Sequence, residues 1–294
     1  MYKQILRDTF ASVFEHKDSL FKALIIPTVL LVIFQQFTHD VKATMENGVT
    51  NYYEVIPATV LIIIFNITIA ITAHRVLLLG EDSIPKWGIF KLSKRELGFA
   101  WNIVLLVLLC LLATTIFGLF LFLIFYAFEL FVDLSFIPED LLIGAAFMLA
   151  FLPSIFIVSS ISLIFPSIAT NKPITMTEAW RLANNHRMLC FVTVIVFPII
   201  FGAIFGFVYG IVIGFLVNLI APELDILYPI LDVFISVFTI SALSHTYKYL
   251  VQNNEDSFLE NESKDESALL PKNESEELKV EAVLQVQPTE ENNK

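Results

Sequence analysis

Three polar side chains within long apolar blocks are the residues of this sequence best placed to act on an ion. Asp232 lies inside one block, away from the basic segments, Asn66 lies near the middle of a second, and Asn218 lies near the end of a third. Ionisable residues at membrane depth are rare and often mark an ion or proton pathway. A polar track through the three residues is therefore one interpretation. In the other, Asp232 reaches the outer headgroup region and the asparagines form hydrogen bonds between helices.

Two histidines stand at the ends of apolar blocks, His74 and His245. Facing each other, their imidazoles could ligate a haem iron, but nothing else in the sequence supports a haem site. We therefore interpret both, with Arg75, as polar anchors at the membrane surface. Trp87 and Trp180 suit the same level, because indole rings favour the headgroup region.

Four glycines recur at a strict spacing of four and so line one stripe of a helix: Gly202, Gly206, Gly210 and Gly214. Without side chains, such a stripe lets another helix approach closely, and van der Waals packing then drives association. One interpretation is an oligomer interface or a pore-lining face. The other is tight packing within the chain, against a block that carries Gly144, Ala150 and Ser154.

No motif for catalysis or metal binding is recognisable. The sequence has no P-loop, no HExxH motif and no Ser-His-Asp grouping in its loops. Cys110 and Cys190 lie in apolar blocks without metal-ligand or disulfide spacing. We therefore expect no enzyme activity, no cofactor, no metal site and no nucleic-acid partner.

Six apolar blocks must position all of these residues. Apolar residues other than glycine make up 56% of the chain and charged residues 16%, and the mean hydropathy is +0.75. A helix needs roughly 17–25 apolar residues to cross a bilayer. The blocks are 20–37, 55–74, 97–128, 141–170, 189–220 and 227–249. The sequence predicts an all-α, polytopic membrane helix bundle with six transmembrane helices, in which the long third and fifth blocks are single helices.

Lysine and arginine predict the orientation of these helices. They are frequent in every second connection, at 1–22, 75–95 and 172–187, whereas the opposite connections hold only Lys42. Cytoplasmic connections carry such an excess, so we expect both termini in the cytoplasm and the protein in a bacterial inner membrane. No small-residue cleavage site follows the first block, which should therefore stay in the mature protein.

Amphipathic segments precede the spans. Apolar residues recur at helical spacing from Tyr2 to Phe14, which predicts a helix lying on the inner leaflet. Thr175 and Glu178 match a capping box that would begin a second surface helix, and Ser93 with Glu96 would cap the third span. A shorter interfacial piece is expected at 85–91. The chain 1–251 therefore reads as three copies of one unit: a surface helix, an outward span, a turn and a returning span.

The segment 252–294 differs in composition from the rest. It is acidic, rich in Ser and Asn, and has no aromatic residue after Phe258. Such a segment cannot bury enough apolar surface to offset its ordering entropy. We expect a disordered cytoplasmic tail that acts either as an interaction segment or as a solubilising extension.

Two short runs carry a resemblance to known proteins: the run from Ala73 to Gly80, which reads AHRVLLLG, and the run from Glu178 to Leu182, which reads EAWRL. With the layout of residues 1–250, they resemble bacterial six-span inner-membrane proteins akin to the membrane domain associated with glycerophosphodiester phosphodiesterases. The catalytic domain of those enzymes has no counterpart in the sequence. The resemblance therefore implies no phosphodiesterase activity and no active-site residue.

Two classes of function fit these observations. The first is a non-enzymatic scaffold, assembly or lipid-interacting membrane protein, whose partners would be membrane lipids, a second copy of the chain or another membrane protein. The second is a small transporter or channel that uses the polar track of Asp232, Asn66 and Asn218.

The composition of the tail generates the first prediction. A chain that ends at Gln252 should insert and fold like the full-length protein, because the removed residues cannot build a core. Membrane yield and the melting temperature in detergent would be compared for the two chains. Loss of detergent-stable protein on truncation would contradict the prediction.

Overall fold

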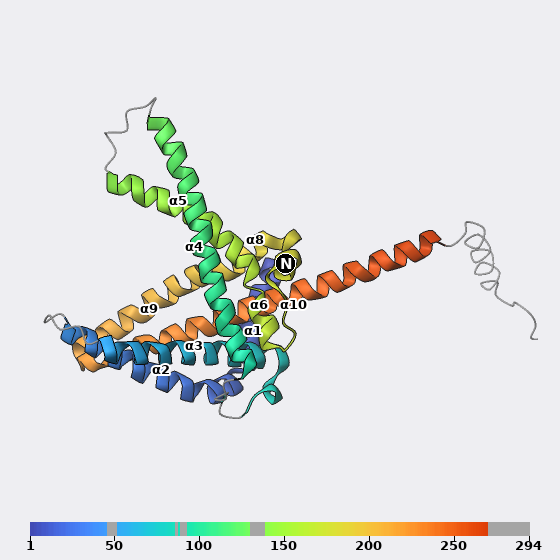
Figure 1. The fold of residues 1–294 in the computed structure, drawn as a ribbon. Helices are drawn as coiled ribbons and strands as arrows, with labels where there is room; N and C mark the ends of the chain where they lie inside the picture. The colour runs from blue at the N-terminus through green and yellow to red at the C-terminus, as the bar shows by residue number, and fades with distance from the viewer. Residues whose placement is uncertain (46–51, 86–87, 89–92, 130–138, 270–294) are drawn as a thin grey trace, which may run out of the picture. The chain divides into compact units, whose positions relative to one another are not determined.

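The structure, a computed structural model, describes residues 1–45, 52–85, 88, 93–129 and 139–269, with side chains for these residues apart from 39–45, 52–54, 129, 139, 140, 222 and 255–269. All regular elements in this part of the chain are helical (Figure 1). The helices are α1 (Tyr2–Glu15), α2 (Lys17–Met45), α3 (Tyr52–Leu79), α4 (Lys94–Glu129), α5 (Glu139–Ile161), α6 (Ile164–Ala169), α7 (Met176–Leu182), α8 (Arg187–Phe191), α9 (Phe197–Leu219) and α10 (Tyr228–Leu269). The shorter turns are η1 (Glu81–Ser83), η2 (Asn184–His186), the π-helical η3 (Val192–Val196) and η4 (Pro222–Leu227).

Six stretches are long and apolar enough to cross a membrane, and they confirm the predicted all-α polytopic bundle. Spans 1 to 6 are Lys17–Thr38, Val55–Leu79, Lys94–Phe128, Leu141–Ala169, Asn184–Leu219 and Glu223–Asn254. The protein is therefore an integral, multi-pass membrane protein. We call the end of the bundle where spans 1, 3 and 5 begin and spans 2, 4 and 6 finish the Arg75 end.

The two long blocks form single spans, as predicted. Span 3 is the uninterrupted helix α4. Span 5 runs through η2, α8, η3 and α9, and its π-helical turn directly precedes Pro198 near the start of α9. Proline lacks an amide hydrogen and crowds the carbonyl four residues before it, and a wider turn relieves that conflict.

Span 4 is interrupted at its Arg75 end. Helix α5 ends at Ile161 and α6 begins at Ile164. Pro166 lies four residues after Ser162 and cannot donate to its carbonyl, so the regular helical hydrogen bond is missing at this point. The carbonyl of Ser162 instead accepts from the Phe165 amide at 3.1 Å.

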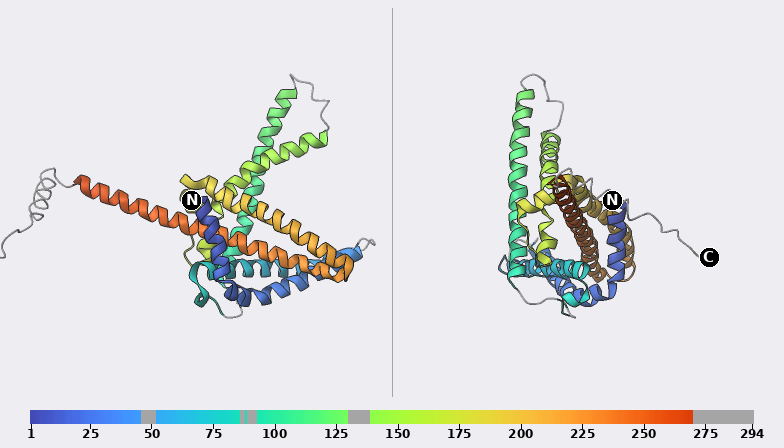
Figure 2. Two further views of the ribbon diagram at one scale, coloured as in Figure 1. Left: turned by 180° about the vertical axis from the view of Figure 1, so that it is seen from behind. Right: turned by 90° about the vertical axis from the view of Figure 1, so that its right-hand side faces the viewer.

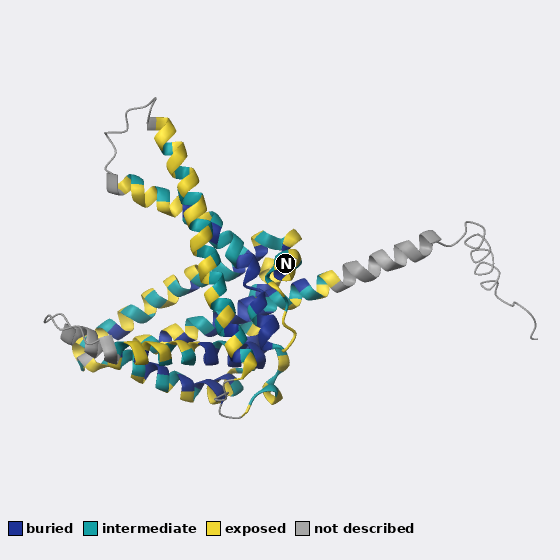
Figure 3. Ribbon diagram, in the orientation of Figure 1, coloured by how far each residue is buried: buried dark blue, intermediate teal, exposed yellow. Residues whose placement is uncertain are grey.

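The buried side chains gather toward the Arg75 end in three clusters (Figure 3). One joins α1, α2, α3, α9 and α10 through residues that include Leu24, Ala73 and Phe238. The second joins α1, α7, α8 and α10, and the third joins α3, α4 and α6. Helices α1, α3 and α10 take part in two clusters each and so connect the core.

Helix α1 packs into this core. Ile5 and Val13 are buried, and the ring of Phe10 lies 5.2 Å from that of Phe238 and 5.8 Å from that of Phe201, measured between centroids. The predicted apolar face is real, but it covers other helices of the chain, while Phe14 stays exposed. Sequence periodicity shows that a helix has an apolar face, but it does not show whether that face packs against lipid or against other helices.

Spans 3 and 4 contribute little to the core. Helix α4 packs against α5 as α2 packs along α3 (Figures 1 and 2). Only 6% of the residues in the most apolar stretch of span 3, and 11% in that of span 4, are buried within the chain, against 33% in spans 1 and 6. Most of the apolar surface of α4 and α5 therefore faces surroundings other than this chain.

Two of the three predicted surface helices are described, α1 before span 1 and α7 before span 5. The interfacial piece expected at 85–91 lies largely outside the described residues. The pairing of α2 with α3 and of α4 with α5 gives consecutive hairpins, and Tyr209 links α9 to the start of span 6 through a hydrogen bond to the carbonyl of Leu227. The three-fold repeat expected from the sequence stays a prediction.

Helix α10 continues to Leu269, where the sequence predicted an irregular tail from residue 252. No Gly or Pro occurs between Pro229 and Pro271, so nothing in the backbone stops the helix earlier. Proline disfavours helical geometry in the residue before it, which accounts for an end just short of Pro271. Residues 270–294 lie outside the described part, and the chain divides into two units, Met1–Leu250 and Val251–Lys294.

Both halves of the predicted capping box of α7 are present. The Thr175 amide donates to the Glu178 carboxylate at 2.6 Å, and the Glu178 amide donates to the Thr175 hydroxyl at 3.2 Å. At the start of α4, the Ser93 amide donates to the Glu96 carboxylate at 2.8 Å. The sequence therefore located both helix starts correctly.

The capping box predicts a local pH dependence. Hydrogen bonds from the Thr175 amide and hydroxyl lower the pKa of Glu178. A lowered pKa in the folded state means that the box stabilises α7 above the unfolded pKa and that this contribution is lost as the pH falls through the folded value. Amide hydrogen exchange at Thr175, corrected for intrinsic rates, should therefore accelerate on acidification. Glu178→Gln removes the titration, so the same pH dependence in that variant would contradict the prediction.

Candidate functional site

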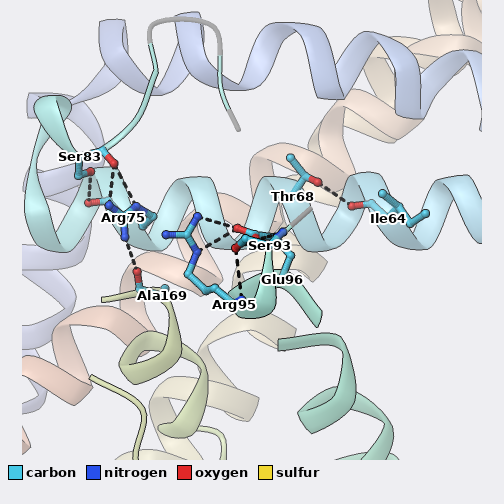
Figure 4. A network of polar contacts seen from close by, with 8 residues as sticks. All are labelled: Ile64, Thr68, Arg75, Ser83, Ser93, Arg95, Glu96 and Ala169. Atoms are coloured by element: carbon cyan, nitrogen blue, oxygen red, sulfur yellow. Dashed lines mark hydrogen bonds and ion pairs between the residues drawn. The ribbon is translucent and has the colours of Figure 1, made fainter. Parts of the chain in front are cut away.

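Two sets of polar contacts lie at the ends of spans 2, 3 and 4, one joining Arg75 to Ser83 and Ala169 and the other joining Glu96 to Ser93 and Arg95, and we call them together the Arg75 cluster (Figure 4). Arg75 is 9% exposed. Its Nε and Nη2 donate to the carbonyl oxygen of Ser83 at 3.1 and 2.7 Å, and its Nη1 donates to the carbonyl oxygen of Ala169 at 2.9 Å. One guanidinium therefore joins the end of span 2 to the following turn and to the end of span 4.

The bond to Ala169 completes the termination of α6. Asn171 adopts φ 59°, and its amide donates to the carbonyl of Ile168, while the Lys172 amide donates to that of Ser167. These two bonds form a Schellman motif, with asparagine in the left-handed position that glycine usually fills. The carbonyl of Ala169 would otherwise lack a donor, and a cation suits the negative end of a helix dipole.

Ser83 returns a hydrogen bond to the end of span 2. Its hydroxyl lies 3.2 Å from the carbonyl oxygen of Arg75 and 2.6 Å from that of Gly80. Gly80 ends α3 with φ 83°, a backbone conformation that costs glycine little. Arg75 and Ser83 thus form reciprocal hydrogen bonds across a tight turn, in which the side chain of each bonds to the backbone carbonyl of the other.

A second ionic group stands at the start of span 3. Glu96 is 3% exposed, and its carboxylate accepts hydrogen bonds from the Ser93 amide and hydroxyl and from Nε and Nη2 of Arg95. The closest approach of the ion pair, Arg95 Nη2 to Glu96 Oε1, is 2.6 Å. A buried carboxylate that is bonded on both oxygens acts as a structural group, because its charge is already balanced locally.

Hydroxyl and imidazole groups link the remaining elements at the Arg75 end. The Nδ1 of buried His74 lies 2.7 Å from the Ser244 hydroxyl, which joins α3 to α10. The Ser241 hydroxyl donates to the Thr9 carbonyl of α1 at 3.1 Å, and the Thr246 hydroxyl donates to that of Thr193 at 3.0 Å. Every contact in this set crosses between elements that are distant in sequence. The polar groups of the site therefore form hydrogen bonds that hold the helix ends together.

The predicted anchors divide into distinct environments. His74 and Arg75 are buried within the bundle, and His245 is half-buried. His74 bonds to Ser244, the residue before His245, so its Nδ1 is engaged there. Trp180 is half-buried beneath the guanidinium of Arg187, and Trp87 lies outside the described residues.

The residues of the predicted polar track lie on exposed surfaces of three spans. Asp232, Asn66 and Asn218 are all exposed. The amide nitrogens of the two asparagines donate within their own helices, Asn66 to the carbonyl of Ile62 and Asn218 to that of Gly214. Asparagine commonly bonds locally in this way where no partner from another helix is near. Among the described residues, no hydrogen bond joins Asp232, Asn66 and Asn218 to one another.

The glycine stripe is open along most of its length. A Cβ atom built on Gly202 would lie 3.8 Å from Ile235 of α10, but at Gly206, Gly210 and Gly214 it would meet no atom within 4 Å. The predicted packing partner within the chain, the face with Gly144, Ala150 and Ser154, is therefore not seated on these three positions. The stripe remains an unfilled surface of α9.

Sequence reasoning missed the partners of the Arg75 cluster. Arg75 was recognised as an anchor and Glu96 as a cap, but the acceptors of Arg75 are backbone carbonyls of Ser83 and Ala169, which every residue possesses. Only the end of α6 could have been predicted from the sequence, because Pro166 interrupts the helix shortly before Asn171, a residue type that tolerates the left-handed conformation.

Comparisons of the chain with known protein families, curated proteins and solved structures found no match. The two runs that carry the resemblance to six-span proteins have structural roles here. Residues 73–80 end α3 and supply Arg75 and Gly80, and residues 178–182 belong to the capped helix α7. Both runs are thus explained by helix termination and packing.

Substitution of Arg75 tests the fastening role. Arg75→Gln leaves the Ser83 and Ala169 carbonyls without their charged donor, so the free energy of unfolding should fall by about 2 kcal/mol or more. Arg75→Lys should also destabilise, because one ammonium group lacks the planar fork that reaches both carbonyls. The measurement is the melting temperature in detergent. Arg181→Gln makes the same charge change at an exposed site and should melt like wild type; equal melting of all variants would contradict the assignment.

Proposed function

We propose that the chain is a non-enzymatic scaffold, assembly or lipid-interacting protein of a bacterial inner membrane, with both termini in the cytoplasm. One observation carries the proposal: the ionic groups of Arg75, Arg95 and Glu96 are engaged in holding helix ends together, while the long apolar faces of α4 and α5 are left uncovered. Exposed apolar surface of this extent suits contact with lipids or with other membrane proteins.

The orientation is supported by the basic residues at the Arg75 end. Arg75, Arg95 and Arg187 lie at the ends of three different spans there, and Arg7 lies on α1. Excess Lys and Arg mark the cytoplasmic side of bacterial membrane proteins. The buried core would then lie at the cytoplasmic side, and the opposite ends of spans 3 and 4 would face the periplasm.

The glycine stripe adds a candidate contact for assembly. Its open positions on α9 would let the backbone of another helix approach closely, and a second copy of the chain offers the same stripe for a symmetric contact. Membrane lipids, a second copy and another membrane protein are the partners that fit this proposal. Flux across liposomes that contain the purified protein would favour a transporter instead.

The orientation is tested with reporter fusions. The proposed topology places the connections after spans 1, 3 and 5 in the periplasm, because the alternate connections are basic. Fusions that should report the periplasm follow Lys42, Asp133 and Glu223, and fusions that should report the cytoplasm follow Lys91, Lys172 and Gln252. One reversed connection would overturn the topology.

Assembly through the stripe is tested with the double substitution Gly206→Leu/Gly210→Leu. The added side chains meet open space within the chain, so the melting temperature in detergent should stay close to that of wild type. They would block a second copy, so cross-linked dimer should disappear.

The matched control for that experiment is Val208→Leu/Val212→Leu, because these two exposed residues lie on another face of α9. The control should cross-link like wild type. Dimer that persists in the glycine variant would remove the stripe from the proposed assembly, and a large loss of stability would show that another part of the chain packs there.

A further inference from the structure

We propose that Arg187 and Trp180 form a binding site for a phosphate group at the Arg75 end, a site that takes the phosphodiester of an anionic phospholipid. The inference rests on the proposed function in one respect, that the protein interacts with lipids of the leaflet at this end. It adds a defined position and a ligand chemistry. The site lies where α7 leads into η2, the first turn of span 5.

A comparison of the arginines singles out Arg187. The chain has five arginines. Arg75 donates to two backbone carbonyls, Arg95 pairs with Glu96, and Arg7 lies beside Asp8 at 3.4 Å. Arg181 is exposed to solvent. Arg187 is partly buried, yet no carboxylate of the described residues forms an ion pair with it.

The geometry holds the Arg187 guanidinium in a fixed position. Its central carbon lies 3.9 Å from the centroid of the Trp180 ring, within the range of a cation–π contact. Its Nη2 donates to the side-chain oxygen of Asn184 at 2.8 Å. The group is thus held from one face by the indole and at one edge by a neutral amide, and neither contact neutralises its charge.

The Nε of Arg187 shows that the site lacks an acceptor. This atom is shielded from solvent and has no hydrogen-bond partner within the described part of the chain. A shielded, unpaired donor on a cation is costly, and nearby negative charge lowers that cost. The planar guanidinium fork matches a phosphate in shape and charge, so a phosphate at the remaining Nη donors would supply the negative charge that the site lacks, while Nε itself gains no hydrogen bond.

The position of the site favours a lipid as the source of the phosphate. Trp180 immediately precedes span 5, which begins at Asn184, and tryptophan prefers the headgroup level. Helix α7 is held at this entry by its capping box and by the burial of Ala179. A phospholipid phosphate lies at that depth in the bilayer, whereas free phosphate must arrive from the aqueous phase.

The test uses Trp180 as its own reporter. The full-length variant Trp87→Phe/Trp101→Phe retains Trp180 as the single tryptophan. In a sugar detergent that contains no phosphate, its emission is titrated with dihexanoyl-phosphatidylglycerol, with sodium phosphate and with dihexanoylglycerol. We expect a saturable change with the phospholipid and none with the phosphate-free lipid. A matching saturable change with sodium phosphate would identify the same anion site with free phosphate as its source.

Substitutions in that background decide the matter. Arg187→Gln should weaken phosphatidylglycerol binding by about tenfold or more, because the charge-assisted contact is lost. Arg181→Gln makes the same charge change six residues earlier and should bind like the parent. If Arg187→Gln does not fold, Arg187→Lys replaces it, and affinity should fall several-fold because the planar fork is lost.

Three results would overturn the site: unchanged affinity in the Arg187 variant that folds, an equal loss in Arg181→Gln, or an equal response to dihexanoylglycerol. None of these depends on the oligomeric state or on flux. If the phosphate site is absent but the glycine substitutions abolish the dimer, the proposed scaffold function still stands. If the protein instead transports a solute, Arg187 could still bind phosphate.

Discussion

The bonds from Arg75 to the carbonyls of Ser83 and Ala169 are the contacts on which the rest of the bundle depends. Inside a membrane, apolar helices gain little by leaving lipid for one another, so apolar burial alone does not decide which helix ends meet. Directional bonds to backbone groups that lack partners can decide it, because each such group is costly to leave unpaired in an apolar environment. Arg75 supplies three of them from one side chain, two to Ser83 and one to Ala169, and the bond to Ala169 joins the end of span 2 to the end of span 4.

This constraint explains why the core lies toward one end of the spans. His74 with Ser244, and Ser241 with the carbonyl of Thr9, add further links at the same level. Away from that level, spans 3 and 4 have few buried side chains. A bundle fastened at one end can expose long apolar surfaces without losing its connections, and those surfaces are then available to lipids or partners.

The sequence predicted the features that depend on local composition. The six spans follow from the length of apolar runs, and the start of α7 follows from Thr175 and Glu178, because a capping box is complete within four residues. The partners of Arg75 could not be predicted, since carbonyl oxygens carry no sequence signature. The burial of α1 was also missed, because an amphipathic pattern does not show what the apolar face packs against. The extension of α10 to Leu269 was missed as well, because no helix-breaking residue occurs before Pro271.

Arg75, which is buried, and Arg187, which is half-buried, show how the same type of side chain can serve either structure or ligand binding. Arg75 has its donors directed at carbonyls of the chain, so an incoming anion would have to break those bonds before it could bind. Arg187 has one neutral acceptor and an aromatic face, so an anion can bind without breaking a bond that holds the fold. Binding at Arg187 would therefore leave the fastened core intact, and the lipid contact and the assembly of the bundle can be separated by mutation.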